Sequence, residues 1–348
     1  MQIGIDSFAA AIPDAETGAR IAPTERLRNL LEEIELADQV GLDVFGIGEH
    51  HREEFLDSAP SIILAAAAGR TKNIHLSSAV TVLSAADPVR VFQEFATLDL
   101  ISQGRAEMVV GRGSFIEAYP LFGLKLEDYE DLFIEKLDLL LKIRDNLHVT
   151  WSGKHRPALN NQAVYPRPLQ EQLPIWVGVG GTPQSFARAG YLGLPLMVAI
   201  IGGQQHRFRP LIDLYREAGA RAGHTPEKLK VGLHMLGFLG DTTQEAADIF
   251  YPGYSTMFTQ IGKERGWAPT TRAQYDFTRN KTGAFLIGDA ETVVEKVLYT
   301  NEALGGISRL DFQMTVATLP HDKMMHAIEI LGTKVAPTIR KELGSSAL

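Results

Sequence analysis

Short apolar runs alternate with amphipathic segments along most of the chain, and this alternation limits the possible folds more than any other feature. Runs that are apolar on both faces are typical of parallel strands covered on both sides. We expect eight strands, at residues 2–8, 44–48, 74–83, 105–110, 174–179, 196–201, 230–239 and 310–316. We expect eight helices, at residues 24–41, with Thr24 as N-cap, and at 59–69, 89–100, 127–144, 183–192, 209–222, 292–304 and 321–343.

Eight strands alternating with eight helices favour a (β/α)8 TIM barrel over an open doubly wound sheet, which is the second alternative. Two segments, at about residues 145–173 and 240–285, lose this periodicity, and we expect them to be insertions after strands 4 and 7. The first contains three prolines and is compatible with a short hairpin, whereas the second suggests a mobile lid. We expect a single domain over residues 1–348.

Composition excludes several classes of protein. Hydrophobic residues make up 45% of the chain, enough for a large core, and the net charge of -8 argues against a nucleic-acid binder. Cysteine is absent, which excludes disulfides, thiolate metal sites and cysteine nucleophiles. No apolar run approaches the roughly 20 residues of a membrane span, and no signal segment is expected. We therefore expect a cytoplasmic protein.

The second apolar run ends abruptly in Glu49, His50 and His51. In a closed parallel barrel the carboxyl ends of the strands carry the chemistry, so these three side chains are candidates for a functional site. Surface histidines without a function are the alternative. Neighbouring residues of a strand point to opposite faces, so His50 and His51 are a poor pair for one metal ion, and we expect no metal. The chain also lacks a Gly-x-Ser-x-Gly motif, so a serine hydrolase has no support.

Two glycine-rich turns are expected at the same rim. The turn after the fifth strand contains Gly180, Gly181, Thr182, Gln184 and Ser185 around Pro183, and it can present backbone N–H groups and a helix N-terminus to an anion. The turn after the fourth strand adds Arg112, whose guanidinium can bind the same anion with two hydrogen bonds. Glycines that only allow a tight turn are the alternative.

These motifs together resemble the bacterial luciferase-like flavin monooxygenases. The resemblance rests on their order and spacing along nearly the whole chain. It is carried by residues 49–51 (EHH), 78–83 (SAVTVL), 87–90 (DPVR), 104–105 (GR), 111–113 (GRG), 180–185 (GGTPQS) and 287–289 (IGD).

The resemblance implies a barrel that binds reduced FMN, supplied by a separate NAD(P)H-dependent flavin reductase, and uses dioxygen to oxidise a small organic substrate. His50 matches the histidine beside the flavin and is the implied catalytic residue. Ala79 and Val80 match a pair joined by a non-prolyl cis peptide under the flavin ring. The implied phosphate-binding residues are Arg112, Ser114, Gly180, Gly181, Thr182, Gln184 and Ser185. Phe8, Phe115 and Tyr119 are candidates for the substrate side.

Departures from the luciferases limit what the resemblance implies. Their catalytic subunit has a cysteine where this chain has Gly111, so light emission is not predicted. Three alternatives remain: a hydride-transfer enzyme that uses a deazaflavin coenzyme on the same barrel, a flavin-binding barrel without catalysis, and a metal-dependent hydrolase, for which the strand ends supply too few ligands. Family members are commonly homodimers, and residues 65–69 and the helix at 89–100 are candidates for that contact.

Overall fold

The computed structural model describes residues 1–13, 17–315 and 319–344, which form a closed barrel of eight parallel strands. Strand β11 pairs with both β9 and β1, and β8 pairs with β9, so the sheet closes on itself and the predicted (β/α)8 TIM barrel is confirmed. The barrel strands are β1 (Gln2–Ser7), β2 (Val44–Ile47), β3 (His75–Val82), β4 (Met108–Gly111), β7 (Ile175–Val179), β8 (Leu196–Ile200), β9 (Val231–Leu239) and β11 (Arg309–Gln313).

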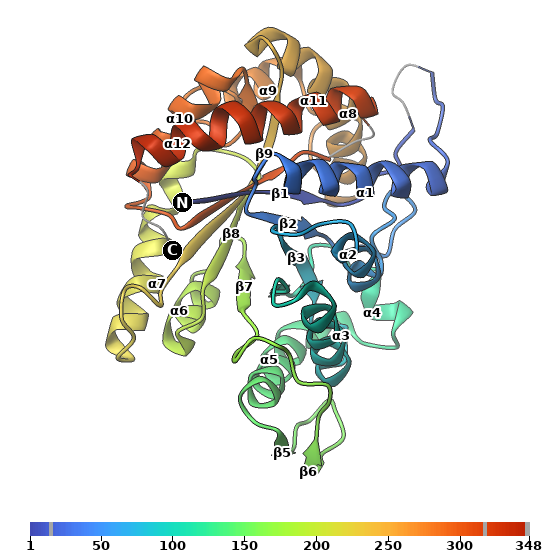
Figure 1. Ribbon diagram of the computed structural model, residues 1–348, viewed down its shortest axis with the longest axis vertical. Helices are drawn as coiled ribbons and strands as arrows, with labels where there is room; N and C mark the ends of the chain where they lie inside the picture. The colour runs from blue at the N-terminus through green and yellow to red at the C-terminus, as the bar shows by residue number, and fades with distance from the viewer. Residues whose placement is uncertain (14–16, 316–318, 345–348) are drawn as a thin grey trace.

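Helices surround the barrel, as Figure 1 shows. Their apolar sides pack on the outward faces of the strands and form one continuous core, because both faces of a parallel sheet need cover. The helices are α1 (Pro23–Gln39), α2 (Pro60–Ala68), α3 (Pro88–Ser102), α4 (Ala118–Leu121), α5 (Tyr129–Asp145), α6 (Pro183–Leu192), α7 (Arg209–Arg221), α8 (Thr243–Arg265), α9 (Arg272–Thr278), α10 (Ala290–Ala303), α11 (His321–Ile330) and α12 (Ala336–Glu342). Within the described part of the chain, no helix is both long and apolar enough to cross a membrane.

The inside of the barrel is apolar in one part and charged in another. Val109, Trp176 and Met197 form a small separate core, on which Val80 packs. Arg309 lies over the Trp176 ring, 4.4 Å from its centroid, and forms a buried ion pair with Glu107. The lumen is therefore filled by side chains, as in other eight-stranded barrels, and space for a ligand is confined to its rim.

Both expected insertions are present. The first contains an antiparallel hairpin of β5 (His148–Trp151) and β6 (Leu159–Ala163), which projects beyond α3 and α5 in Figure 1. The second consists mostly of helices α8 and α9, followed by the unpredicted short strand β10 (Leu286–Gly288), which pairs with the end of β9. The poor periodicity of this segment after its first helix did not reveal α9, and the mobile lid stays a prediction.

Most helix ends lie within two residues of the expected ones, and two differences have a clear physical cause. Helix α1 begins at Pro23 with Ala22 as its N-cap, so Thr24 is not the cap; proline is favoured at this first position because its missing N–H would have no partner there. The expected C-terminal helix is interrupted by a π-helical turn at Leu331–Val335, just before Pro337, which cannot donate the hydrogen bond that a regular helix needs. Val316, the expected end of the last strand, lies outside the described residues.

Candidate functional site

His50 and Asp57 form a buried pair at the carboxyl end of β2. The strand ends at Ile47, and the loop that follows returns Asp57 to the imidazole. Nδ1 of His50 lies 2.8 Å from Asp57 Oδ2, and the backbone N–H of His50 donates to Oδ1 at 3.1 Å. Burial raises the pKa of Asp57 above its usual value, and the neighbouring His50 offsets only part of this rise. When Asp57 is ionised it accepts from Nδ1–H, which leaves Nε2 of His50 to exchange a proton with a ligand.

Glu49 and His51 have structural contacts instead. Glu49 accepts a hydrogen bond from the backbone N–H of Val82 at 2.8 Å and contacts Nε2 of His51 at 3.2 Å. Glu49 therefore joins the ends of β2 and β3, and His51 packs against Phe122 rather than beside the imidazole of His50. Both histidines lie in the loop after β2, so the alternation of side chains along a strand does not apply to them, and the absence of a metal stays a prediction.

The peptide bond between Ala79 and Val80 is cis, as the resemblance implied. Val80 of β3 projects toward two glycines, one on the neighbouring strand β4 and one on β7, the next strand along. A Cβ at Gly111 would lie 2.8 Å from Val80 Cγ2, and a Cβ at Gly178 would lie 2.8 Å from Val80 Cγ1. The glycine at position 111, where the luciferases have cysteine, is thus explained by the space that Val80 occupies.

Arg112 and Arg188 converge on one carboxylate. Both guanidinium groups pair with Glu130 of α5, and Arg112 also lies over the Tyr129 ring, 5.2 Å from its centroid. These ion pairs lower the pKa of Glu130 against the opposing effect of its burial. The buried Nη1 of Arg188 has no hydrogen-bond partner among the residues that the structure describes. A small hollow beside α6 is lined by Arg112, Arg188 and Ser185. At this hollow the two guanidinium groups share a single carboxylate, that of Glu130.

The turn between β7 and α6 lies next to this pair of cations. Gly180 and Gly181 have no heavy atom within 4 Å of the position of an added Cβ, so their backbone faces open space. Thr182 is the N-cap of α6 but makes no side-chain cap, and the N–H of Ser185 bonds to its carbonyl. The exposed N-terminus of α6 and the two guanidinium groups together suit a phosphate group.

Ser114 contributes its backbone rather than its hydroxyl group. Its carbonyl oxygen accepts a hydrogen bond from Arg265 at 2.8 Å, and Arg265 also lies 5.4 Å from the centroid of the Phe115 ring. Arg52, from the loop after β2, forms ion pairs with Glu264, Glu117 and Glu54. The end of α8 is thereby fastened to the loops that follow β2 and β4, and it covers the rim beside His50.

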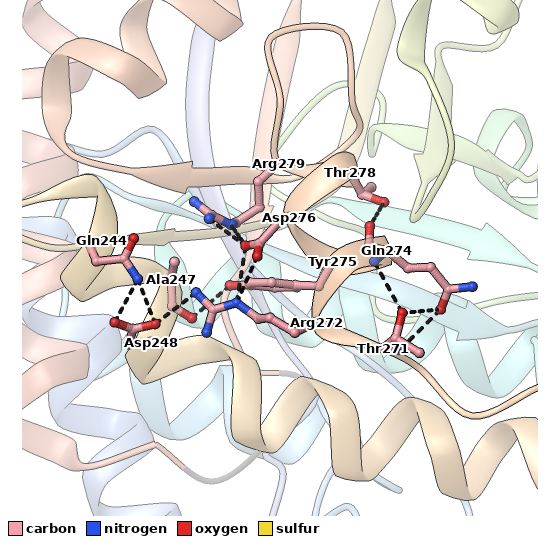
Figure 2. A network of polar contacts seen from close by, with 10 residues as sticks. All are labelled: Gln244, Ala247, Asp248, Thr271, Arg272, Gln274, Tyr275, Asp276, Thr278 and Arg279. Atoms are coloured by element: carbon pink, nitrogen blue, oxygen red, sulfur yellow. Dashed lines mark hydrogen bonds and ion pairs between the residues drawn. The ribbon is translucent and has the colours of Figure 1, made fainter.

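Helix α9 is fastened to the start of α8 by a second polar network, shown in Figure 2. Arg272 pairs with Asp248 of α8 at 2.8 Å and with Asp276 at 3.1 Å, and the hydroxyl of Tyr275 donates to the carbonyl of Ala247 at 3.1 Å. Thr271 and Gln274 form a capping box at the N-terminus of α9. The cover is therefore held at both ends by ion pairs, in addition to the apolar side chains such as Phe250 and Tyr275 that it packs into the core.

Two of the three predicted substrate-side rings are found beside His50. The centroid of Phe8 lies 4.4 Å from that of His50, and Phe115 lies 5.4 Å away from it in a T-shaped arrangement. Tyr119 is 2% exposed and donates its hydroxyl to the carbonyl of Arg112 at 3.0 Å. Among the described residues, no ring contact or hydrogen bond joins Tyr119 to Phe8 or His50, so its placement supports the loop rather than a substrate pocket.

Sequence reasoning missed several residues of this rim. Asp57 and Glu130 are carboxylates that become informative only once their partners are known, and Arg188 lies on an ordinary amphipathic helix. His234 was the detectable omission, because a histidine inside the otherwise apolar run at 230–239 is unusual for a strand buried on both faces. Its position predicts an inward side chain with a polar partner.

Comparison with known proteins decides the family. The sequence profile of the luciferase-like monooxygenases matches residues 1–306. The chain belongs to this family. It is accordingly a flavin-dependent oxidoreductase. Among the curated relatives of this luciferase-like chain is 3,6-diketocamphane 1,6-monooxygenase of Pseudomonas putida, 24% identical over 348 residues that cover 87% of this chain and 90% of that protein.

Solved structures share the barrel of this luciferase-like protein. Monooxygenase RslO1 from Streptomyces bottropensis has a TM-score of 0.83 at 21% identity, covering 97% of this chain and 99% of that one. The oxygenating constituent of the Pseudomonas putida 3,6-diketocamphane monooxygenase, in complex with FMN, has a TM-score of 0.78 at 22% identity with the same coverage. An F420-dependent secondary alcohol dehydrogenase has a TM-score of 0.74 at 19% identity, again with 97% and 99% coverage. These similarities show a shared fold.

Proposed function

We propose that this luciferase-like protein is an FMN-dependent monooxygenase that uses reduced FMN and dioxygen to oxidise a small organic substrate. One observation carries the proposal: a histidine–aspartate pair, a cis peptide and a phosphate-type cradle lie on the ends of neighbouring strands of one barrel. Each feature alone has structural explanations. Their combination on one rim is what a flavin mononucleotide requires, because its ring and its phosphate need different surroundings.

The residues present fit FMN. Arg112, Arg188 and the N-terminus of α6 would hold the phosphate, and the open space at Gly180 and Gly181 lets it approach the backbone. Thr182 is the N-cap of α6, and Gln184 and Ser185 lie in the first turn of that helix. Ala79 and Val80 would support the flavin ring from below, with Gly111 and Gly178 leaving room for the Val80 side chain. Ser114 would act through its backbone, near the phosphate side.

Bound reduced FMN would supply the electrons that activate dioxygen. His50, held by Asp57, would give or take a proton at Nε2 beside the reacting atoms. Phe8 and Phe115 would give the substrate an apolar surface next to this imidazole. The end of α8, fastened by Arg52 and Arg265, would limit the access of water to the site.

Several partners follow from this proposal. A transient, NAD(P)H-dependent flavin reductase would supply the reduced FMN, and the protein would act in the cytoplasm. A homodimer is proposed because Ile62 on α2 and Leu100 and Ile101 on α3 are 70%, 46% and 52% exposed. Ala67 and Ala68 of the expected contact at 65–69 are buried against the barrel instead. Analytical ultracentrifugation would test the dimer.

A second candidate is hydride transfer with a deazaflavin coenzyme, and it is favoured by the likeness in fold to the F420-dependent alcohol dehydrogenase. The same rim would serve it, but no dioxygen would be consumed. A flavin-binding barrel without catalysis is the third candidate. The buried His50–Asp57 pair argues against it, since a carboxylate kept out of water to orient one imidazole has a cost in stability that binding alone does not require.

An anaerobic titration distinguishes these candidates. The protein is titrated with reduced FMN and, separately, with the reduced deazaflavin coenzyme, and air is then admitted to each complex in the presence of an alkanal or a cyclic ketone. Saturable binding of reduced FMN, followed by incorporation of 18O from labelled dioxygen into the product, would support the monooxygenase. Binding of the deazaflavin alone would exclude it. Binding of FMN with no product from any substrate in a broad panel would favour the barrel without catalysis.

A further inference from the structure

A second histidine–aspartate pair lies inside the barrel, apart from His50 and Asp57. Nδ1 of His234 on β9 is 2.6 Å from Oδ2 of Asp6 on β1, and both side chains are buried. Strand β11 separates β9 from β1 in the sheet, so the contact crosses the lumen rather than joining neighbouring strands. The Asp6 side chain faces the lumen, because a Cβ on Gly46 would lie 2.0 Å from Asp6 Oδ1 and 2.9 Å from the Cβ of Ala79.

The charges around this pair fix the orientation of the imidazole. Asp311 lies between the two strands, in register with His234 and with Gly4. Burial and the negative charge of Asp6 raise the pKa of Asp311 well above its usual range. Asp6 as the carboxylate accepts from Nδ1–H of His234. Among the residues that the structure describes, the imidazole of His234 makes its hydrogen bond at Nδ1, and none is made at Nε2.

Phe8 connects the two pairs. Its ring is stacked on His234, with 5.8 Å between centroids and 12° between planes, and its centroid is 4.4 Å from that of His50. Two imidazoles, each held at Nδ1 by a buried aspartate, therefore border the same phenyl ring. The imidazole of His234 retains 8% exposure, which places it at the floor of the rim rather than within closed packing.

Gln313 gives an independent sign that this floor receives a polar ligand. Its side chain is fully buried, and neither its amide nitrogen nor its amide oxygen has a partner among the described residues. It is in register with Asp6 on β1 and therefore faces the lumen as Asp6 does. A buried amide without partners is destabilising, so such a group is usually satisfied by water or by a ligand.

We propose that Nε2 of His234, whose ring is held by Asp6, forms a second polar contact for the molecule bound at the rim, on the other side of Phe8 from His50. The contacted group carries a carbonyl, hydroxyl or N–H. It is either the pyrimidine edge of the flavin or an oxygen of the substrate. This inference rests on the proposed function and adds to it a preference for polar ligands, because an apolar group placed there would leave Nε2 of His234 without a hydrogen-bond partner. Asp6 acts as a positioning residue.

Nitrogen-15 NMR of the histidine rings tests this contact directly. The resonance of His234 Nε2 is assigned by its loss in His234→Gln, and it is followed as reduced FMN is added anaerobically and as cyclohexanone is then added to the complex. A shift upon addition of FMN identifies the flavin edge as the ligand. A shift only with the ketone identifies the substrate. If the protein does not bind FMN, the proposed function fails separately, and the deazaflavin coenzyme, which has the same pyrimidine edge, replaces it. No shift of His234 with any of these probes overturns the inference.

Variants provide a second measurement. If His234 contacts the pyrimidine edge of the flavin, His234→Ala should weaken the affinity for FMN by roughly tenfold, as expected for the loss of one polar contact to a neutral ligand. His234→Gln should restore part of this affinity. If His234 instead contacts the substrate, His234→Ala should leave the affinity for FMN unchanged and should weaken the affinity for the ketone by the same factor. His148→Ala, at an exposed histidine of the hairpin, is the control. Asp6→Asn should alter the ring tautomer of His234 in the same spectra. If both affinities of His234→Ala lie within twofold of the unmodified protein, the contact does not exist.

Discussion

Asp57 accepts two hydrogen bonds from His50, one from the ring and one from the backbone, at 2.8 and 3.1 Å. A single carboxylate thus fixes both the position and the tautomer of the imidazole. Because Asp57 is fully buried, it can orient His50 only as long as both partners remain, and removing one leaves the other without compensation.

We therefore expect His50→Ala to slow the reoxidation of bound reduced FMN by dioxygen by about 100-fold or more, the usual contribution of an acid–base group. Its affinity for reduced FMN should change less than threefold. Stopped-flow absorbance measures the rate, and an anaerobic titration measures the affinity. Asp57→Asn should slow the rate less, because the imidazole remains but its tautomer is no longer fixed. Equal rates in all three proteins would remove His50 from the chemistry.

The phosphate cradle is tested by comparing FMN with riboflavin, which lacks the phosphate. Arg112→Ala should weaken the affinity for FMN by roughly 10- to 100-fold, because a charged hydrogen bond is lost, and should leave the affinity for riboflavin unchanged. Glu130→Gln should have the opposite effect on the ratio of the two affinities, since it removes the carboxylate that competes for both arginines. Fluorescence titration gives both constants. If riboflavin is weakened as much as FMN, the arginine acts on the fold and not on the phosphate.

Gly111→Ala tests the space around the cis peptide. The new Cβ would lie 2.8 Å from Val80 Cγ2, and such overpacking should lower the free energy of unfolding by about 1–3 kcal/mol. Gly202→Ala, where the Cβ would have open space, is the matched control. The double variant Gly111→Ala/Val80→Ala should recover part of the loss. Urea denaturation measures all of them, and strict additivity of the two substitutions would contradict the close contact.

The fastening of α8 predicts a local change in dynamics. Arg52→Met removes the ion pair to Glu264, and amide hydrogen exchange in the last two turns of α8 should accelerate roughly fivefold, for a contact worth about 1 kcal/mol. Arg272→Met should instead accelerate exchange in α9, because Arg272 holds that helix to Asp248 (Figure 2). Mass spectrometry resolves the two segments. Acceleration spread equally over both helices in either variant would show that they open as one unit.

Lys296 predicts a pH dependence of stability. Burial and the charge of Arg279 lower its pKa to about 7, and its ammonium group donates to the carbonyls of Arg279 and Phe285. The unfolded chain, with an ordinary lysine, binds more protons than the folded protein between about pH 7 and pH 10, so stability should rise across this interval, by at most about 1.4 kcal/mol per pH unit. Lys296→Met should flatten the rise, and Lys281→Met, at an exposed lysine, should not. Denaturation at several pH values measures the slope, and an unchanged slope in Lys296→Met would contradict the assignment.

Much of the fold could be predicted because its signals are local. The apolar run at 44–48 and the polar residues after it identified both a strand and its functional end, because the burial and the end of a strand each depend on a few neighbouring residues. The segment at 240–285 was harder, because α8 and α9 are held by contacts such as Arg272 with Asp248 and Arg52 with Glu264, and these join distant positions. The periodicity of the sequence does not reveal contacts between distant positions.

The sequence by itself determined the alternation of strands and helices, the glycine-rich turns and the position of His50 at a strand end, because these depend on the backbone preferences and polarity of neighbouring residues. Only the tertiary structure decided which side chains meet. Closure of the barrel brings Asp6 to His234, 228 residues apart, and packing of α5 against α6 and β4 brings Glu130 to Arg112 and Arg188. A single substitution in such a pair changes the site while leaving the local pattern intact, so the pairings are fixed by the fold and not by the segments that form it.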